Sequence, residues 1–153
     1  MSESKGLPPS LLDISNFSDG GLKVLVVEDN DSDFELMCYR LKQGGLKYTA
    51  TRVDRIEDLR KCLEHEEWQV VISDHNLPGF GSEEALRVVR DSGLDIPFII
   101  VSGSIGEHVA VEAMRAGADD YLMKDKLARL VPAIERSLRA ANERRSLAAA
   151  ELA

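Results

Sequence analysis

Three carboxylates, one hydroxyl and one ammonium stand directly at the ends of apolar segments: Glu28, Asp29, Asp74, Ser102 and Lys124. Two carboxylates 4 Å apart repel by about 4 kcal/mol at an effective dielectric of 20, so a cluster of three needs a cation. Magnesium takes oxygen ligands, keeps several waters and is usually held by one or two carboxylates together with a substrate phosphate. These residue types therefore predict magnesium-assisted phosphate chemistry, provided that the fold brings them together.

The donor atoms suggest which residues would bind the metal directly and which through water. Asp29 and Asp74 would bind the magnesium ion directly. Glu28 could hold a metal-bound water, and the backbone carbonyl of Asn76 could complete the protein ligands.

Asp74 is also the expected nucleophile. A carboxylate beside magnesium and a lysine can accept a phosphoryl group, because catalysis of this transfer is mostly positioning and charge neutralisation. Lys124 and the Ser102 hydroxyl would bind the oxygens of the transferred group. Taken singly, each residue has a simpler interpretation, since polar side chains end strands at wet loops and an aspartate often caps the next helix.

Short β-branched runs alternate with longer segments of helical period, which predicts an α/β fold with a parallel sheet wrapped by helices. Strands are expected at residues 22–27, 47–53, 69–73, 96–102 and 119–123. Helices are expected at residues 31–43, 55–67 and 106–117, and from about residues 82 and 126 onwards. Right-handed crossovers would wind these five units on both sides of one sheet, so that the polar residues meet at its carboxyl edge.

Composition divides the chain into three parts. Residues 1–20 are rich in Ser, Gly, Pro and Asp and predict a mobile N-terminal extension, whereas residues 21–140 hold the α/β domain. In residues 141–153 apolar side chains continue at spacings of three and four, which predicts a helical extension or linker. This extension is either a solvated tail or a signalling helix that forms a homodimer or leads into an effector.

The charge balance excludes some partners. With 19 Lys and Arg against 27 Asp and Glu, the net charge of −8 disfavours direct contact with nucleic acid or with an anionic membrane. No run of about 18 apolar residues occurs, and the first residues lack the apolar stretch of a signal peptide, so we expect a cytoplasmic protein. Cys38 and Cys62 stand alone in helical segments and are expected to be reduced thiols.

Four segments occur in a characteristic order: "VLVVEDN", "VVISDHNLPG", "IIVSGS" and "AGADDYLMK". Together they resemble the receiver domain of bacterial two-component response regulators, over about residues 22–140. The resemblance implies a flavodoxin-like (βα)5 fold with strand order 2-1-3-4-5. It also implies that a histidine kinase, or an intermediate phosphotransfer protein, donates a phosphoryl group to Asp74. Such a domain is no conventional enzyme, since it catalyses only its own phosphorylation and dephosphorylation.

The same resemblance implies a switch. Ser102 would move towards the phosphoryl group while the Tyr121 ring turns inward, and the face made by the fourth helix, fifth strand and fifth helix would change its unknown downstream partner. Asn76 and Ser104 occupy the two positions that tune the lifetime of the phosphorylated form in such domains. Neither is charged, so neither strongly attracts or repels an attacking water.

Two positions need separate expectations. The receiver pattern usually places proline after the strand-five lysine, but here Asp125 follows Lys124. A non-proline cis bond costs about 2.5 to 4 kcal/mol, so we expect either a trans bond or an unusual, strained one. His75 adjoins Asp74 and is expected on the loop surface, with its side chain directed away from the pocket.

One functional alternative stays open: an unphosphorylated receiver-like module for protein interaction or dimerisation. The complete set of polar residues at the strand ends argues against it. A dinucleotide-binding fold is excluded, because the segment "GFGSEE" lacks the GxGxxG pattern.

Overall fold

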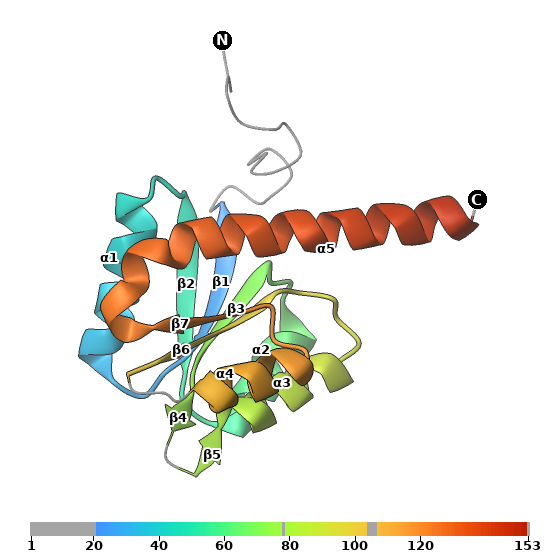
Figure 1. Ribbon diagram of the computed structural model, residues 1–153. Coiled ribbons are helices and arrows are strands. Elements are labelled where there is room, and N and C mark those ends of the chain that lie inside the picture. The colour runs from blue at the N-terminus through green and yellow to red at the C-terminus, as the bar shows by residue number, and fades with distance from the viewer. Residues whose placement is uncertain (1–20, 78, 104–106, 153) are drawn as a thin grey trace.

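A computed structural model describes residues 21–77, 79–103 and 107–152. A five-stranded parallel sheet lies between two layers of helices (Figure 1). Its strands are β1 (Leu22–Val27), β2 (Tyr48–Val53), β3 (Val70–Asp74), β6 (Phe98–Ser102) and β7 (Asp120–Met123). The helices are α1 (Asp31–Gln43), α2 (Ile56–His65), α3 (Ser82–Asp91), α4 (Glu107–Arg115), the 3-10 helix η2 (Lys124–Arg129) and α5 (Leu130–Leu152).

The strand order is β2-β1-β3-β6-β7, so the predicted order of the five parallel strands is confirmed. A small antiparallel pair, β4 (Asn76–Leu77) and β5 (Phe80–Gly81), was not predicted. Two-residue strands are too short to show a hydrophobic period, although Gly79 between them has φ +87°, a conformation that glycine adopts easily.

The alternation of side chains along β1 shows why helices cover both faces. Val24 and Val26 point into a core shared with α1 and α5, whereas Leu25 and Val27 point into a second core shared with α2, α3 and α4. A strand buried on both faces has no polar alternation, which is why these strands read as continuous apolar runs. In β3 and β6, which are buried along their whole length, a charged side chain can therefore be placed only at a strand end.

The last helix begins later and runs further than its core requires. The backbone of Lys126 is not helical, so α5 starts at Leu130 and not near residue 126 as predicted. Its first part buries Ile134, Leu138 and Ala141, and residues 143–151 are exposed. At 1.5 Å per residue its 23 residues span roughly 34 Å. The extended C-terminal helix is therefore confirmed.

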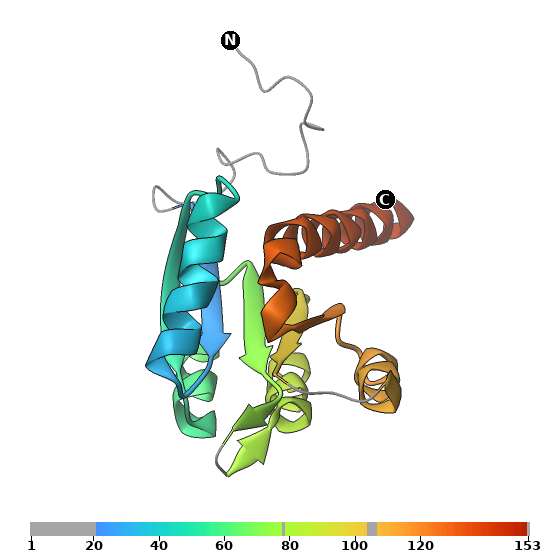
Figure 2. The same ribbon diagram turned by 60° about the vertical axis from the view of Figure 1, so that its left-hand side comes forward.

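The β4–β5 hairpin and the C-terminal part of α5 lie at opposite ends of the molecule. In both views the hairpin is at the bottom and the C-terminal part of α5 is at the top (Figures 1 and 2).

No described peptide bond is cis, so the bond between Lys124 and Asp125 is trans, the less costly of the two alternatives. None of the helices that the structure describes is long and apolar enough to cross a membrane.

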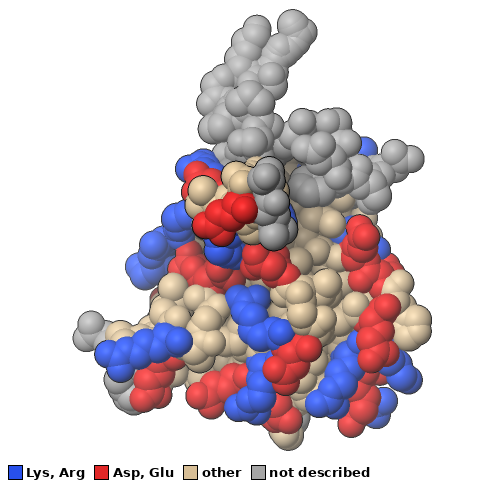
Figure 3. Space-filling model, turned by 90° about the vertical axis from the view of Figure 1, so that its right-hand side faces the viewer, with Lys and Arg blue, Asp and Glu red and all other residues tan. Residues whose placement is uncertain are grey.

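On the face shown in Figure 3, basic and acidic side chains are interleaved and no broad basic patch is visible.

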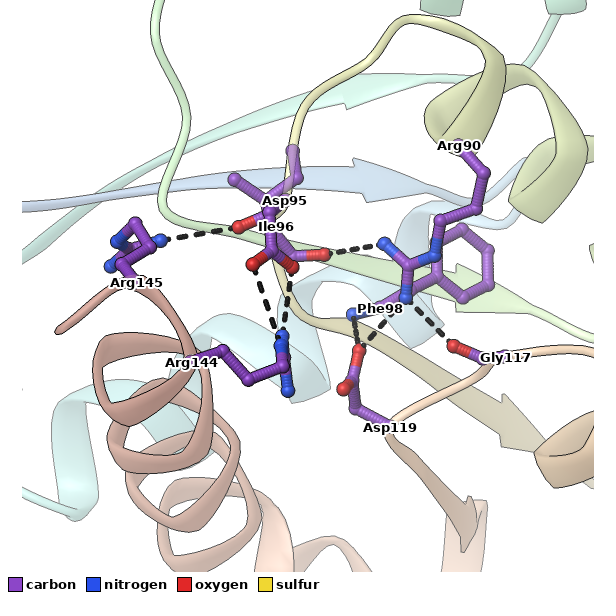
Figure 4. A network of polar contacts seen from close by, with 8 residues as sticks. All are labelled: Arg90, Asp95, Ile96, Phe98, Gly117, Asp119, Arg144 and Arg145. Carbon is purple, nitrogen blue, oxygen red and sulfur yellow. Dashed lines mark hydrogen bonds and ion pairs between the residues drawn. The ribbon is translucent and has the colours of Figure 1, made fainter. Parts of the chain in front are cut away.

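The exposed part of α5 forms hydrogen bonds with the loop before β6. Arg144 donates to both carboxylate oxygens of Asp95, at 2.8 and 3.4 Å, and Arg145 donates to the Asp95 carbonyl at 3.2 Å (Figure 4). The hydrogen bond from Arg144 lowers the pKa of Asp95.

Arg90 of α3 extends this set of contacts across the same edge (Figure 4). Its guanidinium donates to the carbonyls of Ile96 and Gly117, at 2.8 and 2.7 Å, and pairs with Asp119 at 3.1 Å. Asp119 also accepts the backbone N–H of Phe98 at 2.8 Å. These bonds fix the entry points of β6 and β7, the two strands whose far ends carry Ser102 and precede Lys124.

Candidate functional site

The parallel register aligns the carboxyl ends of β1 and β3. Val27 pairs with Ser73, so the next residues, Glu28 and Asp74, lie level with each other. Glu28 is fully buried and Asp74 is only 7% exposed. A strand end held by sheet hydrogen bonds positions both carboxylates rigidly.

The register of β6 and β7 brings the remaining groups to the same edge. Asp74 pairs with Val101 on β6, and Ser102, which is 1% exposed, pairs with Met123 on β7. Lys124 follows Met123 at once. The structure therefore brings together the residues that the sequence placed at the strand ends.

Three carboxylates form the centre of this edge. Glu28, Asp29 and Asp74 each offer an oxygen atom within 4.8 Å of the other two. The backbone N–H of Asn30 donates to one oxygen of Glu28 at 3.1 Å. The other oxygen lies 3.4 Å from Lys124 Nζ but receives no hydrogen bond from any residue that the structure describes. An oxygen-only donor set with an unsatisfied buried carboxylate oxygen fits a hard divalent cation such as magnesium.

Lys124 is the cation of the site. Its Nζ lies 2.5 Å from Asp33, 3.3 Å from Asp74 and 3.4 Å from Glu28. Burial by itself would lower the pKa of Lys124, but the hydrogen bond with Asp33 and the charges of Glu28 and Asp74 outweigh it and raise the pKa. The lysine is therefore held as an ammonium.

Glu28 shows that this one cation does not balance the site. Burial and the nearby charge of Asp74 raise the pKa of Glu28 to about 7, and the bond from Asn30 and the charge of Lys124 offset only part of this rise. A carboxyl whose pKa is raised in this way binds a proton near neutral pH unless another positive charge replaces it. A further positive charge at this edge would therefore stabilise the ionised form of Glu28.

Ser102 and Tyr121 also meet at this edge. The Tyr121 hydroxyl oxygen is buried. Burial raises the pKa of Tyr121, the Ser102 hydroxyl lowers it, and the charge of Asp74 raises it further. Because its hydroxyl oxygen is buried, the aromatic ring of Tyr121 is turned inward.

Comparison with known proteins identifies this arrangement. A family model described as the response regulator receiver domain matches residues 24–135. The chain belongs to this receiver family. It is 37% identical over 102 residues to the response regulator protein FleR of Pseudomonas aeruginosa, an alignment covering 67% of this chain and 21% of FleR. The chain therefore spans about a fifth of the length of this relative.

Solved structures of receivers share the fold. A signal receiver domain from Vibrio parahaemolyticus is 25% identical with a TM-score of 0.72, and the match covers 82% of this chain and 96% of that one. The receiver domain of the sensor histidine kinase PA1611 from Pseudomonas aeruginosa is 26% identical with a TM-score of 0.65, over 77% and 98% of the two chains. That structure is described with a magnesium ion coordinated in its active-site cleft.

Sequence reasoning missed one charged residue of the receiver site. Asp33 forms the shortest ion pair of Lys124 and so draws the lysine towards α1. Its place is fixed because the side chain of Asn30 caps α1 and accepts the N–H of Asp33 at 2.8 Å. The signal was present, since an N-cap asparagine followed three residues later by an acid predicts a carboxylate in the first turn.

The prediction for His75 was wrong in part. The residue lies in the turn between β3 and β4, but its side chain is only partly exposed, because it contacts Ser82 and Tyr121. Three other expectations lie outside the described residues: those for Ser104, for residues 1–20 and for the side chain of Asn76.

Proposed function

We propose that Asp74 accepts a phosphoryl group from the phosphohistidine of a histidine kinase or of an intermediate phosphotransfer protein. A carboxylate oxygen of Asp74 would attack phosphorus, the phosphorus–nitrogen bond would break, and the histidine nitrogen would keep the bonding electron pair. The observation that supports this most is the convergence of Lys124 and the three carboxylates on one oxygen-lined edge. Loss of the acyl phosphate to water would reset the domain.

Magnesium is the proposed cofactor of this transfer. Asp29 and Asp74 would bind it directly, Glu28 would hold a metal-bound water, and the carbonyl of Asn76 would complete the protein ligands. When bound, the metal supplies positive charge that neutralises the phosphoryl oxygens. The unsatisfied oxygen of Glu28 supports this assignment, and the magnesium described for the PA1611 receiver agrees with it.

Lys124 and Ser102 would bind the phosphoryl oxygens from the other side. Lys124 already lies 3.3 Å from Asp74, and the ion pair with Asp33 orients its ammonium. The Ser102 hydroxyl is buried at the end of β6, next to the strand that carries Asp74. The protein thus provides positioning and fixed charge, which are the main requirements of phosphoryl transfer.

We further propose that Ser102 and Tyr121 form the switch between the two states. Its output would be the face formed by α4, β7 and α5, which binds a downstream protein in the cytoplasm. Val111 and Met114 of α4 are 50% and 45% exposed, so this helix presents apolar surface to a partner. The positions of Asn76 and Ser104 would tune the lifetime of the phosphorylated form.

Self-association through residues 141–153 is a separate proposal. Leu147 in this extension is 67% exposed, more than any other large apolar side chain that the structure describes. Truncation after Ala140 is expected to lower the molar mass measured by light scattering from that of a dimer to that of a monomer. An oligomeric state that does not change on truncation would leave the extension as a linker.

The phosphoacceptor is tested by incubating the full chain with magnesium and acetyl phosphate and measuring the intact mass. We expect the mass of one phosphoryl group to be added, and the addition to be lost in Asp74→Asn and in the presence of EDTA. Asp91→Asn, at an exposed aspartate of α3, is the control and should be phosphorylated normally. No adduct with acetyl phosphate or with a cognate kinase would instead favour the unphosphorylated interaction module.

A further inference from the structure

The backbone of His75 is fixed by two neighbouring elements. Its N–H donates to the carbonyl of Val101 on β6 at 2.9 Å, and its carbonyl accepts the N–H of Ser82 at 3.0 Å. Ser82 is the first residue of α3. His75 is therefore bonded on one side to the strand that ends in Ser102 and on the other to the start of a helix.

The imidazole makes two further contacts from this position. Its Nδ1 lies 2.9 Å from the hydroxyl oxygen of Ser82, a side chain that is only 1% exposed. Its ring centroid lies 5.9 Å from that of Tyr121, with the ring planes tilted by 51°. This distance and tilt are typical of an attractive aromatic pair. The imidazole thus connects the first residue of α3 to the ring of Tyr121.

We propose that His75 is a positioning residue for Tyr121. The imidazole, oriented by Ser82, packs against the inward-turned tyrosine ring and stabilises it relative to the outward orientation. This inference rests on the proposed function, because Tyr121 is part of the proposed switch. It adds α3 to that switch: a partner or substitution that moves Ser82 would change the orientation of Tyr121 without touching Asp74.

The size of the effect follows from the contact that is lost when the tyrosine turns outward. One aromatic pair shifts a two-state equilibrium by roughly two- to tenfold. Variants at position 75 should fold, because one side of His75 borders a cavity of about 350 Å³ lined also by Gly81, Ser82 and the following residues of α3. A smaller side chain would enlarge this cavity and leave the sheet intact.

The test uses the full chain labelled with 3-fluorotyrosine and observed by ¹⁹F NMR without any phosphodonor. The chain has three tyrosines, and Tyr121→Phe assigns the relevant signal. We expect His75→Ala to shift the Tyr121 signal towards that of the 55% exposed Tyr39, with a two- to tenfold larger outward population. His75→Phe, which keeps a ring, should restore the inward signal, and Ser82→Ala should shift it in the same direction as His75→Ala but less.

His65→Ala, at an exposed histidine of α2, is the matched control and should leave the signal unchanged. The proposal is overturned if His75→Ala gives the same Tyr121 signal as this control, or if His75→Phe behaves like His75→Ala. Intact-mass measurement of the same variants with acetyl phosphate reports separately on Asp74. A failure of the phosphoacceptor assignment is therefore distinguishable from a failure of the His75 assignment.

Discussion

The two edges of the sheet treat their charges in opposite ways. At the carboxyl edge, the single ammonium of Lys124 faces Asp33, Asp74 and Glu28 within 3.4 Å. At the opposite edge, Asp95 receives hydrogen bonds from two arginines, Arg144 and Arg145, and Asp119 pairs with a third. One edge carries excess negative charge, whereas each aspartate at the other edge is paired with at least one arginine.

The pKa values of two carboxyls show the consequence. Burial and Asp74 raise the pKa of Glu28 to about 7, whereas the hydrogen bond from Arg144 lowers the pKa of Asp95. The surroundings destabilise the ionised form of Glu28 and stabilise the ionised form of Asp95. This contrast agrees with the proposed binding of a cation and a phosphoryl group at the first edge, and with a structural role for the second edge, which holds strands and a helix together.

The largest effect is expected from removing the cation of the carboxyl edge. Lys124→Ala should slow phosphorylation of Asp74 by acetyl phosphate by about 100-fold or more, because a positioned charge on the transferred group is lost. Time courses of intact mass measure this rate. Lys126→Ala, at an exposed lysine two residues further on, should retain the original rate. Equal rates in all three proteins would show that Lys124 does not act in the transfer.

The next prediction concerns the pH dependence of stability in EDTA. The pKa of Glu28 rises on folding from 4.5 to about 7, so its contribution to stability is complete below pH 4.5 and is lost as the pH rises through 7. At 1.36 kcal/mol per pKa unit, the free energy of unfolding should fall by about 3 kcal/mol over this interval. Glu28→Gln should remove this fall in urea titrations.

Two comparisons make that experiment decisive. Glu112→Gln, at an exposed glutamate of α4, should keep the pH dependence of the unmodified protein. Magnesium should reduce the fall, because the metal compensates the charge of the carboxylates. A pH profile that is the same in Glu28→Gln and in the unmodified protein would contradict the excess negative charge inferred for this edge.

A smaller effect is expected at the opposite edge. Arg144→Ala should lower the free energy of unfolding by about 0.5 to 1 kcal/mol, since both partners of this ion pair are nearly half exposed. Arg139→Ala, at an exposed arginine earlier in α5, should cost less. Urea unfolding midpoints measure both, and phosphorylation rates should not change. Slower phosphorylation of Asp74 in Arg144→Ala would contradict the separate roles inferred for the two edges.

The smallest effect is the acid response of Asp95. Its lowered pKa means that its contribution to stability is present above pH 3.8 and is lost as the pH falls through the lowered value. Solvent screening limits this contribution to about 0.5 kcal/mol. Asp95→Asn should therefore reduce the difference in stability between pH 5 and pH 2.5. This change is opposite in sign to that of Glu28→Gln.

The sequence predicted the carboxyl edge better than the opposite edge. Buried parallel strands read as apolar runs, so Glu28, Asp74 and Lys124 could be placed at their ends from the pattern alone. The pairing of Arg144 with Asp95 could not be predicted, because it joins residues 49 positions apart whose approach depends on the angle at which α5 leaves the sheet. The contact between His75 and Tyr121 also depends on packing, since residues at a turn have no fixed period.

The central claim is that Asp74 is the phosphoacceptor, and the most direct measurement locates the acyl phosphate. Borohydride reduces an aspartyl phosphate to homoserine, which peptide mass spectrometry assigns to one position. After treatment with magnesium and acetyl phosphate, we predict homoserine at position 74 and unmodified aspartate at positions 29 and 33. Homoserine at either of those positions, or at none, would contradict the account.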